Sequence, residues 1–221
     1  MMASLLDHQR ELLEGCGVST DGLNSSEIAD QARAVLDAAD RYRLRAEAPI
    51  LDEHVGDEFQ LKDAEATMRT MAAEPYLTHM PTLTGGTGYE EVRRFYKYHF
   101  IPGWPPDVEV TPISRTVGQG RVVDELIVGF THDREMDAIL PGIKPTGRRV
   151  ELPHAVVVGL QDGKVAYEHI YWDQGSALYQ LGVLPEGLPV VGAEAAQRLR
   201  DPRSVPANRL MTRWAESEGK D

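Results

Sequence analysis

The segment from Gly163 to Asp173 combines the residue types that acid–base chemistry requires with the alternation of a β-strand. Asp173 ends the segment, between Trp172 and an amphipathic run that begins at Ser176. An apolar, aromatic setting raises the pKa of a carboxylic acid towards values at which it exchanges protons near neutral pH. Asp173 is therefore a candidate catalytic group. The alternative is that it caps the helix that follows, since aspartate is a favoured N-cap residue.

Strand alternation divides this segment into two faces, because side chains two residues apart point the same way. One face carries three polar aromatic rings and a carboxylate, and the other carries the rest: Tyr167, His169, Tyr171 and Asp173 against Glu168, Ile170 and Trp172. We expect the first face to line a polar pocket, with His169 as a catalytic candidate and Tyr171 as a ligand contact. In the alternative, the Ile170 and Trp172 face is the core, and the His169 face is exposed or dimeric.

His154 is the third catalytic candidate, because its strand is predicted to pair with the strand that carries His169. With Asp173 it would form the acid–base pair that aldol-type ring closure needs. One group removes a proton beside a carbonyl, and the other protonates the oxygen where charge develops. The alternative is a hydrogen-bonded histidine in the core.

Further candidates for ligand contacts lie on other predicted strands and loops. Asp124 and Glu125 are adjacent in a strand, so one of them must point inwards, where a carboxylate is costly unless it is paired. The pairing alternative is Arg115 or Arg121 on the neighbouring strand. Three more candidates come from an early strand and from the lip of a loop: Tyr76, His79 and Trp104.

Metal and phosphate sites are not predicted. The chain has seven histidines, but none has the spacing of a known metal motif. Four of them could still converge with Glu125: His79, His132, His154 and His169. The glycine-rich run from Gly85 to Gly88 lacks the lysine of a phosphate-binding loop and is predicted to be a turn. We expect neither a metal nor another cofactor.

Composition limits the class of protein. The 221 residues are 42% hydrophobic and carry a net charge of −12, which makes nucleic acid an unexpected partner. The lone Cys16 excludes an internal disulfide and fits a reducing compartment. The N-terminal segment lacks the apolar core of a signal peptide, and no apolar run reaches the ~20 residues of a membrane span. We expect a soluble, cytoplasmic protein.

Hydrophobic periodicity predicts helices first and strands last. Helices are expected over residues 1–15, 25–45, 63–73 and 89–100, with Pro75 ending the third. Strands are expected over residues 76–80, 108–117, 121–131, 149–160 and 164–173, the last two joined as a hairpin, and a helical turn follows over residues 176–181. This order predicts an α+β fold, in which helices cover one face of a curved antiparallel sheet and leave a pocket between the layers.

Several short motifs then suggest a family. Gly142 to Val150, Asp162 to Val165, Glu168-His169, Trp172-Asp173 and Leu178 to Gly182 together resemble the SnoaL-like polyketide cyclase group of the NTF2-like superfamily. The resemblance implies a strongly curved, cone-shaped sheet wrapped by N-terminal helices. It also implies that Asp173 occupies the position of the family's acid–base aspartate. We expect an N-terminal helical extension (1–62), the NTF2-like domain (63–184) and a C-terminal tail (185–221).

The sequence and the resemblance together predict an enzyme that acts on a small apolar carbonyl compound or lactone by aspartate and histidine acid–base catalysis. Cyclisation, isomerisation and dehydration would all use this chemistry. One alternative is a ligand-binding or assembly module without turnover. Another is an epoxide or ester hydrolase in which paired carboxylates such as Asp124 and Asp173 activate water. The expected partners are a small molecule and, through the long termini, a second copy of the chain in a homodimer.

Overall fold

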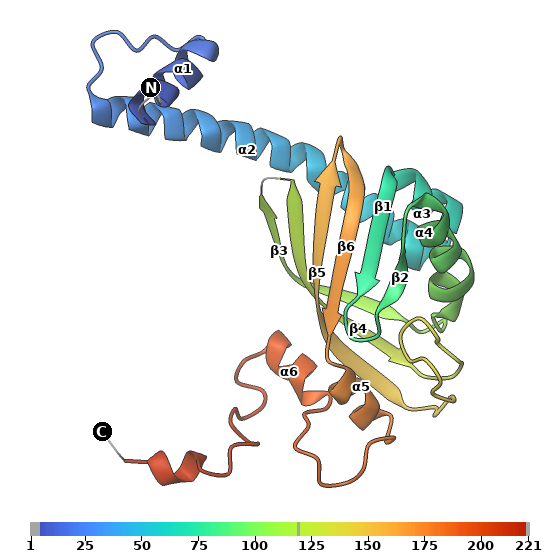
Figure 1. Cartoon of the computed structure of the whole chain (residues 1–221). Coiled ribbons are helices and arrows are strands. Elements are labelled where there is room, and N and C mark those ends of the chain that lie inside the picture. The colour runs from blue at the N-terminus through green and yellow to red at the C-terminus, as the bar shows by residue number, and fades with distance from the viewer. Residues whose placement is uncertain (1–4, 119, 220–221) are drawn as a thin grey trace. The chain divides into compact units, whose positions relative to one another are not determined.

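The computed structural model describes residues 5–118 and 120–219, and it describes side chains outside residues 37–48. The chain divides into two compact units, residues 1–49 and 50–221, and each is described by itself. The predicted boundaries at residues 62 and 184 remain a prediction. Figure 1 shows the elements of both units.

Two helices build the first unit. The helix α1 (Leu5–Gly15) packs Leu13 against Ile28 and Ala32 of α2 (Ser25–Gly56). The helix α2 begins after Asn24, whose side chain accepts hydrogen bonds from the backbone N–H groups of residues 26 and 27. It continues through Pro49 to Gly56, beyond the predicted end at residue 45, and its residues from 50 onwards belong to the second unit. The predicted apolar positions Ala39 and Tyr42 lie outside the described side chains.

A curved, unclosed sheet of six strands forms the second unit, in the order β2-β1-β6-β5-β4-β3 (Figure 1). The strands are β1 (Met71–His79), β2 (Thr84–Thr87), β3 (Glu109–Gly118), β4 (Arg121–Thr131), β5 (Arg149–Gln161) and β6 (Lys164–Trp172). The predicted α+β class is confirmed. The sheet departs from a purely antiparallel one at a single described pair, since β1 runs parallel to β6.

The region between residues 63 and 88 differs from the prediction. The helix α3 (Ala64–Thr70) ends three residues early, and Pro75 lies inside β1, where the pairing with β6 shifts register. The predicted glycine-rich turn is the strand β2. Its glycines are required by close packing: a Cβ on Gly85 would lie 2.1 Å from the Leu77 carbonyl oxygen, and one on Gly86 would lie 2.7 Å from the backbone of Glu91.

Helical segments cover the concave face of the sheet (Figure 1). They are the end of α2 with the π-helical turn η1 (Asp57–Leu61), then α3, α4 (Tyr89–Phe95), the π-helical turn η2 (Tyr96–Phe100) and the short η3 (Ile101–Gly103). The main core of the unit lies between these layers and includes Leu51, Met68, Tyr96, Phe130 and Leu152. This is the arrangement that the predicted order of helices and strands implies.

Short helices follow the sheet: α5 (Gln174–Gln180), α6 (Glu194–Arg200) and η4 (Trp214–Ser217). The hairpin between β5 and β6 is confirmed, and its turn uses positive φ angles at Asp162 (51°) and Gly163 (73°). Across the described parts of the chain, no helix combines the length and the apolar composition of a membrane span.

Candidate active site

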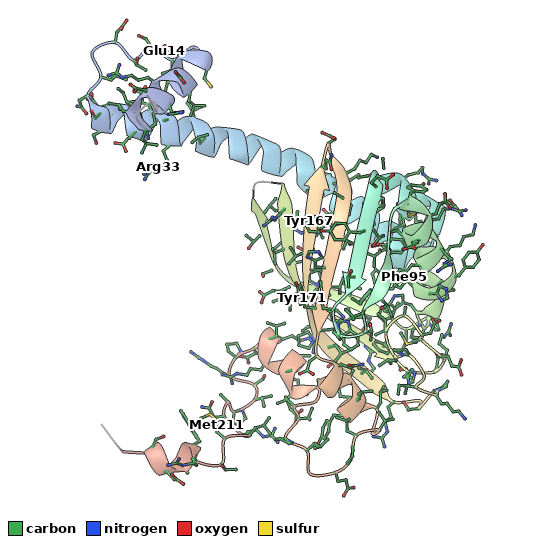
Figure 2. All side chains as sticks on the ribbon, in the orientation of Figure 1. Glu14, Arg33, Phe95, Tyr167, Tyr171 and Met211 are labelled. Carbon is green, nitrogen blue, oxygen red and sulfur yellow. The ribbon has the colours of Figure 1, made fainter. Side chains whose placement is uncertain are left out.

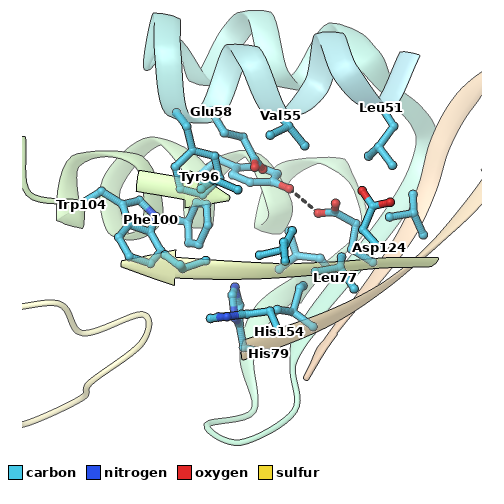
Figure 3. A pocket seen from close by; sticks show the side chains of 18 of the residues that line it. Leu51, Val55, Glu58, Leu77, His79, Tyr96, Phe100, Trp104, Asp124 and His154 are labelled. Atoms are coloured by element: carbon cyan, nitrogen blue, oxygen red, sulfur yellow. Dashed lines mark hydrogen bonds between the residues drawn. The ribbon is translucent and has the colours of Figure 1, made fainter. Parts of the chain in front are cut away.

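A partly open cavity of about 70 Å³ lies between the concave face of the sheet and the helices that cover it (Figure 3). Its walls are mainly aliphatic and aromatic. The polar side chains in the lining are a small set: Glu58, His79, Tyr96, Trp104, Asp124, His154 and Glu168. An apolar cavity with a few convergent polar groups is typical of a small-molecule site.

The sheet register explains which strand residues reach the cavity. Glu168 of β6 lies between Val158 of β5 and Leu77 of β1, and the burial of β6 alternates along the strand. Two residues further on, Ile170 lies opposite His79. Side chains at these positions share the concave face because successive residues of a strand point to opposite sides.

A buried polar cluster forms at the helical wall of the cavity. Tyr96 donates a hydrogen bond of 2.6 Å from its hydroxyl group to Glu168 Oε2, drawn as the dashed line in Figure 3. His54 Nε2 lies 3.2 Å from Glu58 Oε1 and 3.5 Å from Glu168 Oε1. His54 is not among the residues that line the cavity, whereas Glu58, Glu168 and Tyr96 are. The cluster therefore places two carboxyl groups in a mainly apolar cavity, with one imidazole next to them and outside the lining.

The hydrogen bonds fix where the protons of His54 lie. Thr70 uses its hydroxyl proton to donate to the Thr67 carbonyl oxygen at 2.6 Å. Thr70 Oγ1 must therefore accept from His54 Nδ1, at 2.5 Å, so Nδ1 carries a proton. The other ring nitrogen, Nε2, faces carboxylate oxygens and the Tyr96 oxygen, 3.2 Å away, whose own proton goes to Glu168. A second proton on Nε2 gives these acceptors a donor, and His54 is then an imidazolium.

The electrostatics agree with this assignment. Burial lowers the pKa of His54, but the charges of Glu58 and Glu168 and their hydrogen bonds outweigh it and raise the pKa to about 10. Burial likewise opposes ionisation of Glu168, but His54 and the Tyr96 hydroxyl lower its pKa below the ordinary value. The pKa of Glu58 is raised, chiefly by burial and against the effect of His54. Glu168 is thus the anion of the pair, and Glu58 is the group that holds a proton more readily.

The same three residues are the metal-binding candidates among the described side chains. One ligand atom from each of His54, Glu58 and Glu168 lies within 4.8 Å of the others. One imidazole and two carboxylates would suit a divalent cation. In the arrangement described, the second proton of His54 fills the position between the oxygens. The absence of a metal remains a prediction.

Two neutral histidines lie on the sheet side of the cavity. Burial lowers the pKa of His79 to about 3, with a further decrease from His154. Burial also lowers the pKa of His154 to about 4, although its Nδ1 lies 2.9 Å from the Leu152 carbonyl oxygen. Both side chains are therefore uncharged near neutral pH and can form hydrogen bonds to a ligand without adding charge.

Three of the buried histidines, His54, His79 and His154, predict how stability depends on pH. His54 has a folded pKa of about 10 against an ordinary 6.5, so its contribution is complete below pH 6.5 and is lost as pH rises towards 10. His79 and His154 have lowered pKa values, so their burial destabilises the fold as pH falls from 6.5 towards 4 and 3. Urea unfolding across this range should give a maximum near pH 6.5. In His54→Gln the decline on the alkaline side should be absent, and an unchanged decline would contradict the assignment.

Four sequence-predicted residues lie in the cavity: His79, Trp104, Asp124 and His154. Asp124 is the inward member of its pair, and it accepts two hydrogen bonds from Arg115, at 2.7 and 2.8 Å. Arg115 also donates to Asp52 at 2.6 Å. The pairing with Arg115 considered from sequence is therefore present, and Asp124 lies at the end of the cavity opposite Trp104 (Figure 3).

Three predicted residues lie on the opposite face of the sheet. The alternation of β6 is confirmed, but the cavity lies on its Glu168 and Ile170 face, so the expectation that His169 and Tyr171 line the pocket is wrong. Tyr76 stacks on Tyr167 with ring centroids 5.1 Å apart, and His169 lies 4.8 Å from Tyr167. Figure 2 marks Tyr167 and Tyr171 along β6. The alternative considered from the sequence, in which the face with Ile170 and Trp172 is the core, describes this strand correctly.

The remaining two predicted residues lie outside the cavity lining. Asp173 is the N-cap of α5, and its side chain accepts a hydrogen bond from the Ser176 N–H at 3.0 Å. It does not share the cavity with His154. Glu125 is exposed and accepts a hydrogen bond of 2.6 Å from Ser114. It borders an open cleft that adjoins the cavity and shares five residues with it: Val55, Phe59, Val110, Asp124 and Leu126.

The sequence prediction missed the residues that form the buried cluster. Glu168 was assigned to the other face of β6, and His54 and Glu58 fell within the predicted extension. One signal was available, since His54 and Glu58 are four residues apart and so share one face of a helix. Tyr96 was placed on the predicted helix of residues 89–100 but was not connected to a site.

Comparison with protein-family models and with curated proteins finds no match. Solved structures do match. A protein named for the SnoaL-like polyketide cyclases, from Jannaschia sp. CCS1, is 21% identical with a TM-score of 0.51, over 63% of this chain and 95% of its own. TsrD from Streptomyces laurentii is 20% identical with a TM-score of 0.52, over 63% and 98%. AclR from Streptomyces galilaeus, a candidate hydroxylase, is 19% identical with a TM-score of 0.51, over 65% and 89%.

At these sequence identities the structural similarity shows the fold alone. The aligned region spans nearly the whole of the compared proteins. The similarity confirms the resemblance that the sequence motifs suggested. The chain has the α+β fold of these structures, one of which is named for the SnoaL-like polyketide cyclases.

Proposed function

We propose that this protein is an enzyme of the cyclase or isomerase type, which moves protons on a small, apolar, enolisable carbonyl compound. The substrate occupies the cavity together with the cleft that adjoins it, and Glu168 is the base. The observation that carries the proposal is the position of this one carboxylate. Glu168 is buried, faces an apolar cavity, and is held as an anion by His54 from behind and by the Tyr96 hydroxyl at 2.6 Å.

This environment is suited to proton abstraction from carbon. A carboxylate in a site without bulk water is a stronger base towards a bound substrate than the same carboxylate in solution. His54 and Tyr96 fix the orientation of Glu168. Because His54 is cationic, the cluster keeps a single net negative charge when Glu58 is ionised and none when Glu58 holds a proton.

The chemistry balances with the groups in the cavity. Glu168 takes a proton from the carbon beside the carbonyl group, and the C–H electron pair forms the enolate. Either the enolate takes up a proton at a different atom, which is isomerisation, or its carbon attacks a second carbonyl group within the substrate and the resulting alkoxide takes up a proton, which is ring closure. Glu58, whose pKa is raised by burial, is the group suited to give this proton. The proton that Glu168 has taken up then passes to Glu58, so that both groups return to their starting states and proton gain and loss are equal over the cycle.

The fold comparison supports the choice of reaction type. The Jannaschia protein bears the name of the SnoaL-like polyketide cyclases and shares the fold of this chain with a TM-score of 0.51. The adjoining cleft next to Asp124 and Phe59 supports a route by which a small molecule enters.

The test is hydrogen exchange on phenylacetone, a small apolar ketone with acidic benzylic protons. In deuterated buffer, the wild-type protein should accelerate benzylic exchange over buffer alone, as followed by proton NMR. The rate should saturate with ketone concentration, because exchange takes place in the cavity. Saturable binding without acceleration would support the ligand-binding module instead and would contradict the proposed function.

A further inference from the structure

Two polar atoms in the cavity wall lack a partner. The indole nitrogen of Trp104 and Nδ1 of His79 are fully buried, and neither has a hydrogen-bond partner among the described residues. Both side chains are 4% exposed and line the cavity. Leaving a buried donor or acceptor unpaired costs about 1–3 kcal/mol, so such groups in a native fold call for an explanation.

The rings that pack against Trp104 offer its indole nitrogen no acceptor. Its ring packs against three phenylalanine rings, with centroid separations of 5.4 to 5.6 Å: Phe59, Phe100 and Phe130. None of these side chains offers an oxygen or nitrogen acceptor. The indole N–H can only donate, so whatever satisfies it must supply an acceptor.

His79 lines the same cavity as Trp104 and the proposed base. Its ring is 5.4 Å from Phe100, which is itself 5.6 Å from Trp104. Along the sheet, His79 pairs in register with Ile170, two residues beyond Glu168 on the same face. Both residues with an unpartnered polar atom therefore border the cavity that Glu168 also lines.

We propose that the Trp104 indole N–H binds the carbonyl oxygen of the substrate, with His79 as a second polar contact in the cavity that Glu168 also lines. The inference rests on the proposed function and narrows the substrate class. The ligand must carry an acceptor oxygen towards Trp104, an acidic C–H towards Glu168 and an apolar body between the aromatic and aliphatic walls. Because both wall groups are uncharged, a neutral ketone fits better than a carboxylate.

The experiment compares two ligands that differ in one group. Phenylacetone and propylbenzene have the same shape, but a CH₂ replaces the carbonyl group in propylbenzene. The chain has three tryptophans, so proton–nitrogen correlation spectra should contain three indole signals, assigned with Trp104→Phe and Trp172→Phe. Saturating phenylacetone should shift the Trp104 signal far more than propylbenzene does, since only the ketone accepts a hydrogen bond.

Trp172 provides the matched control. Its indole nitrogen is also buried and unpartnered among the described residues, but its side chain does not line the cavity. Trp104→Phe should weaken phenylacetone binding by roughly 5-fold, the effect of one neutral hydrogen bond, and should leave propylbenzene binding nearly unchanged. Trp172→Phe should change neither. Neither variant should lose stability beyond the small packing change, because each removes a donor that has no partner.

The inference is overturned if phenylacetone binds no more tightly than propylbenzene, or if Trp104→Phe binds the ketone as well as Trp172→Phe does. This result is independent of the proposed function. Suppose that exchange depends on Glu168, but Trp104→Phe changes neither ketone binding nor the exchange rate. Glu168 then remains the base, and Trp104 is rejected as the oxygen contact. If instead the Trp104 signal responds to the ketone but no exchange is catalysed, Trp104 is the oxygen contact and the proposed function is rejected.

Discussion

Replacing Glu168 by glutamine is expected to lower the rate of benzylic hydrogen exchange on phenylacetone by about 10²–10⁴-fold, the usual contribution of a positioned general base. Glutamine keeps the size of the side chain and can still accept the Tyr96 hydrogen bond, but it cannot take a proton from carbon. Because the apolar walls are unchanged, affinity for the ketone should change much less than the rate. Exchange rates and binding constants of the two proteins, measured by NMR, separate these effects.

Two other carboxylates serve as comparisons. Glu109 is exposed and pairs with Arg149, so Glu109→Gln removes a carboxylate by the same substitution and should leave exchange unchanged. Asp173→Asn tests the position favoured by the sequence motifs. Asparagine caps a helix about as well as aspartate, so the fold should persist. Loss of exchange in Asp173→Asn with normal rates in Glu168→Gln would reject the account and restore the sequence-based assignment.

Replacing His54 by leucine is expected to lower the free energy of unfolding by about 3–5 kcal/mol, the range for breaking a buried ion pair by removing one partner. The substitution removes the cation that two buried carboxyl groups share at 3.2 and 3.5 Å, and it leaves Thr70 without its donor. Urea denaturation below pH 6.5, where the contribution of His54 is complete, gives the largest difference from wild type.

Two control variants show how much of this decrease in the free energy of unfolding comes from the buried ion pair. His99 pairs with Asp137 at the surface, so His99→Leu should cost less than ~1 kcal/mol. The double variant His54→Leu, Glu168→Leu should be more stable than His54→Leu alone, because an apolar replacement of both partners leaves fewer buried charges. Equal losses in His54→Leu and His99→Leu would show that the buried ion pair does not form.

The sequence predicted the architecture well because architecture depends on periodicity. β4 has the predicted bounds, and the β5–β6 hairpin follows from Asp162-Gly163, whose residues adopt the positive φ angles of its turn. The errors arose where tertiary contacts override local propensity. β2 forms from glycines because Leu77 and Glu91 approach too closely for side chains, and no single-sequence rule reports that approach. The parallel pairing of β1 with β6 is likewise a long-range property.

The candidate site was harder to predict because it depends on which face of a strand is covered. Alternation correctly separated Glu168 from His169, but it gave no information on the side where the helices pack. The carboxylate of Asp173 among aromatic residues suggested a pocket on the His169 face. The negative charge of the buried Glu168 is instead balanced by His54, which lies over a hundred residues earlier in the chain. Asp124 and His154 were placed on the correct strands, since β4 and β5 have nearly the predicted bounds, and they line the cavity together with His79 and Trp104.

The most direct test of the central claim is the protonation state of His54, measured by NMR of its ring nitrogens at a pH between 6.5 and 10. The account predicts an imidazolium with protons on both nitrogens, because Nδ1 donates to Thr70 and Nε2 faces the two glutamates. His79 and His154 should be neutral in the same spectra. A neutral His54 at this pH would contradict the account, since Glu168 would then lack the cation that holds it ready as a base.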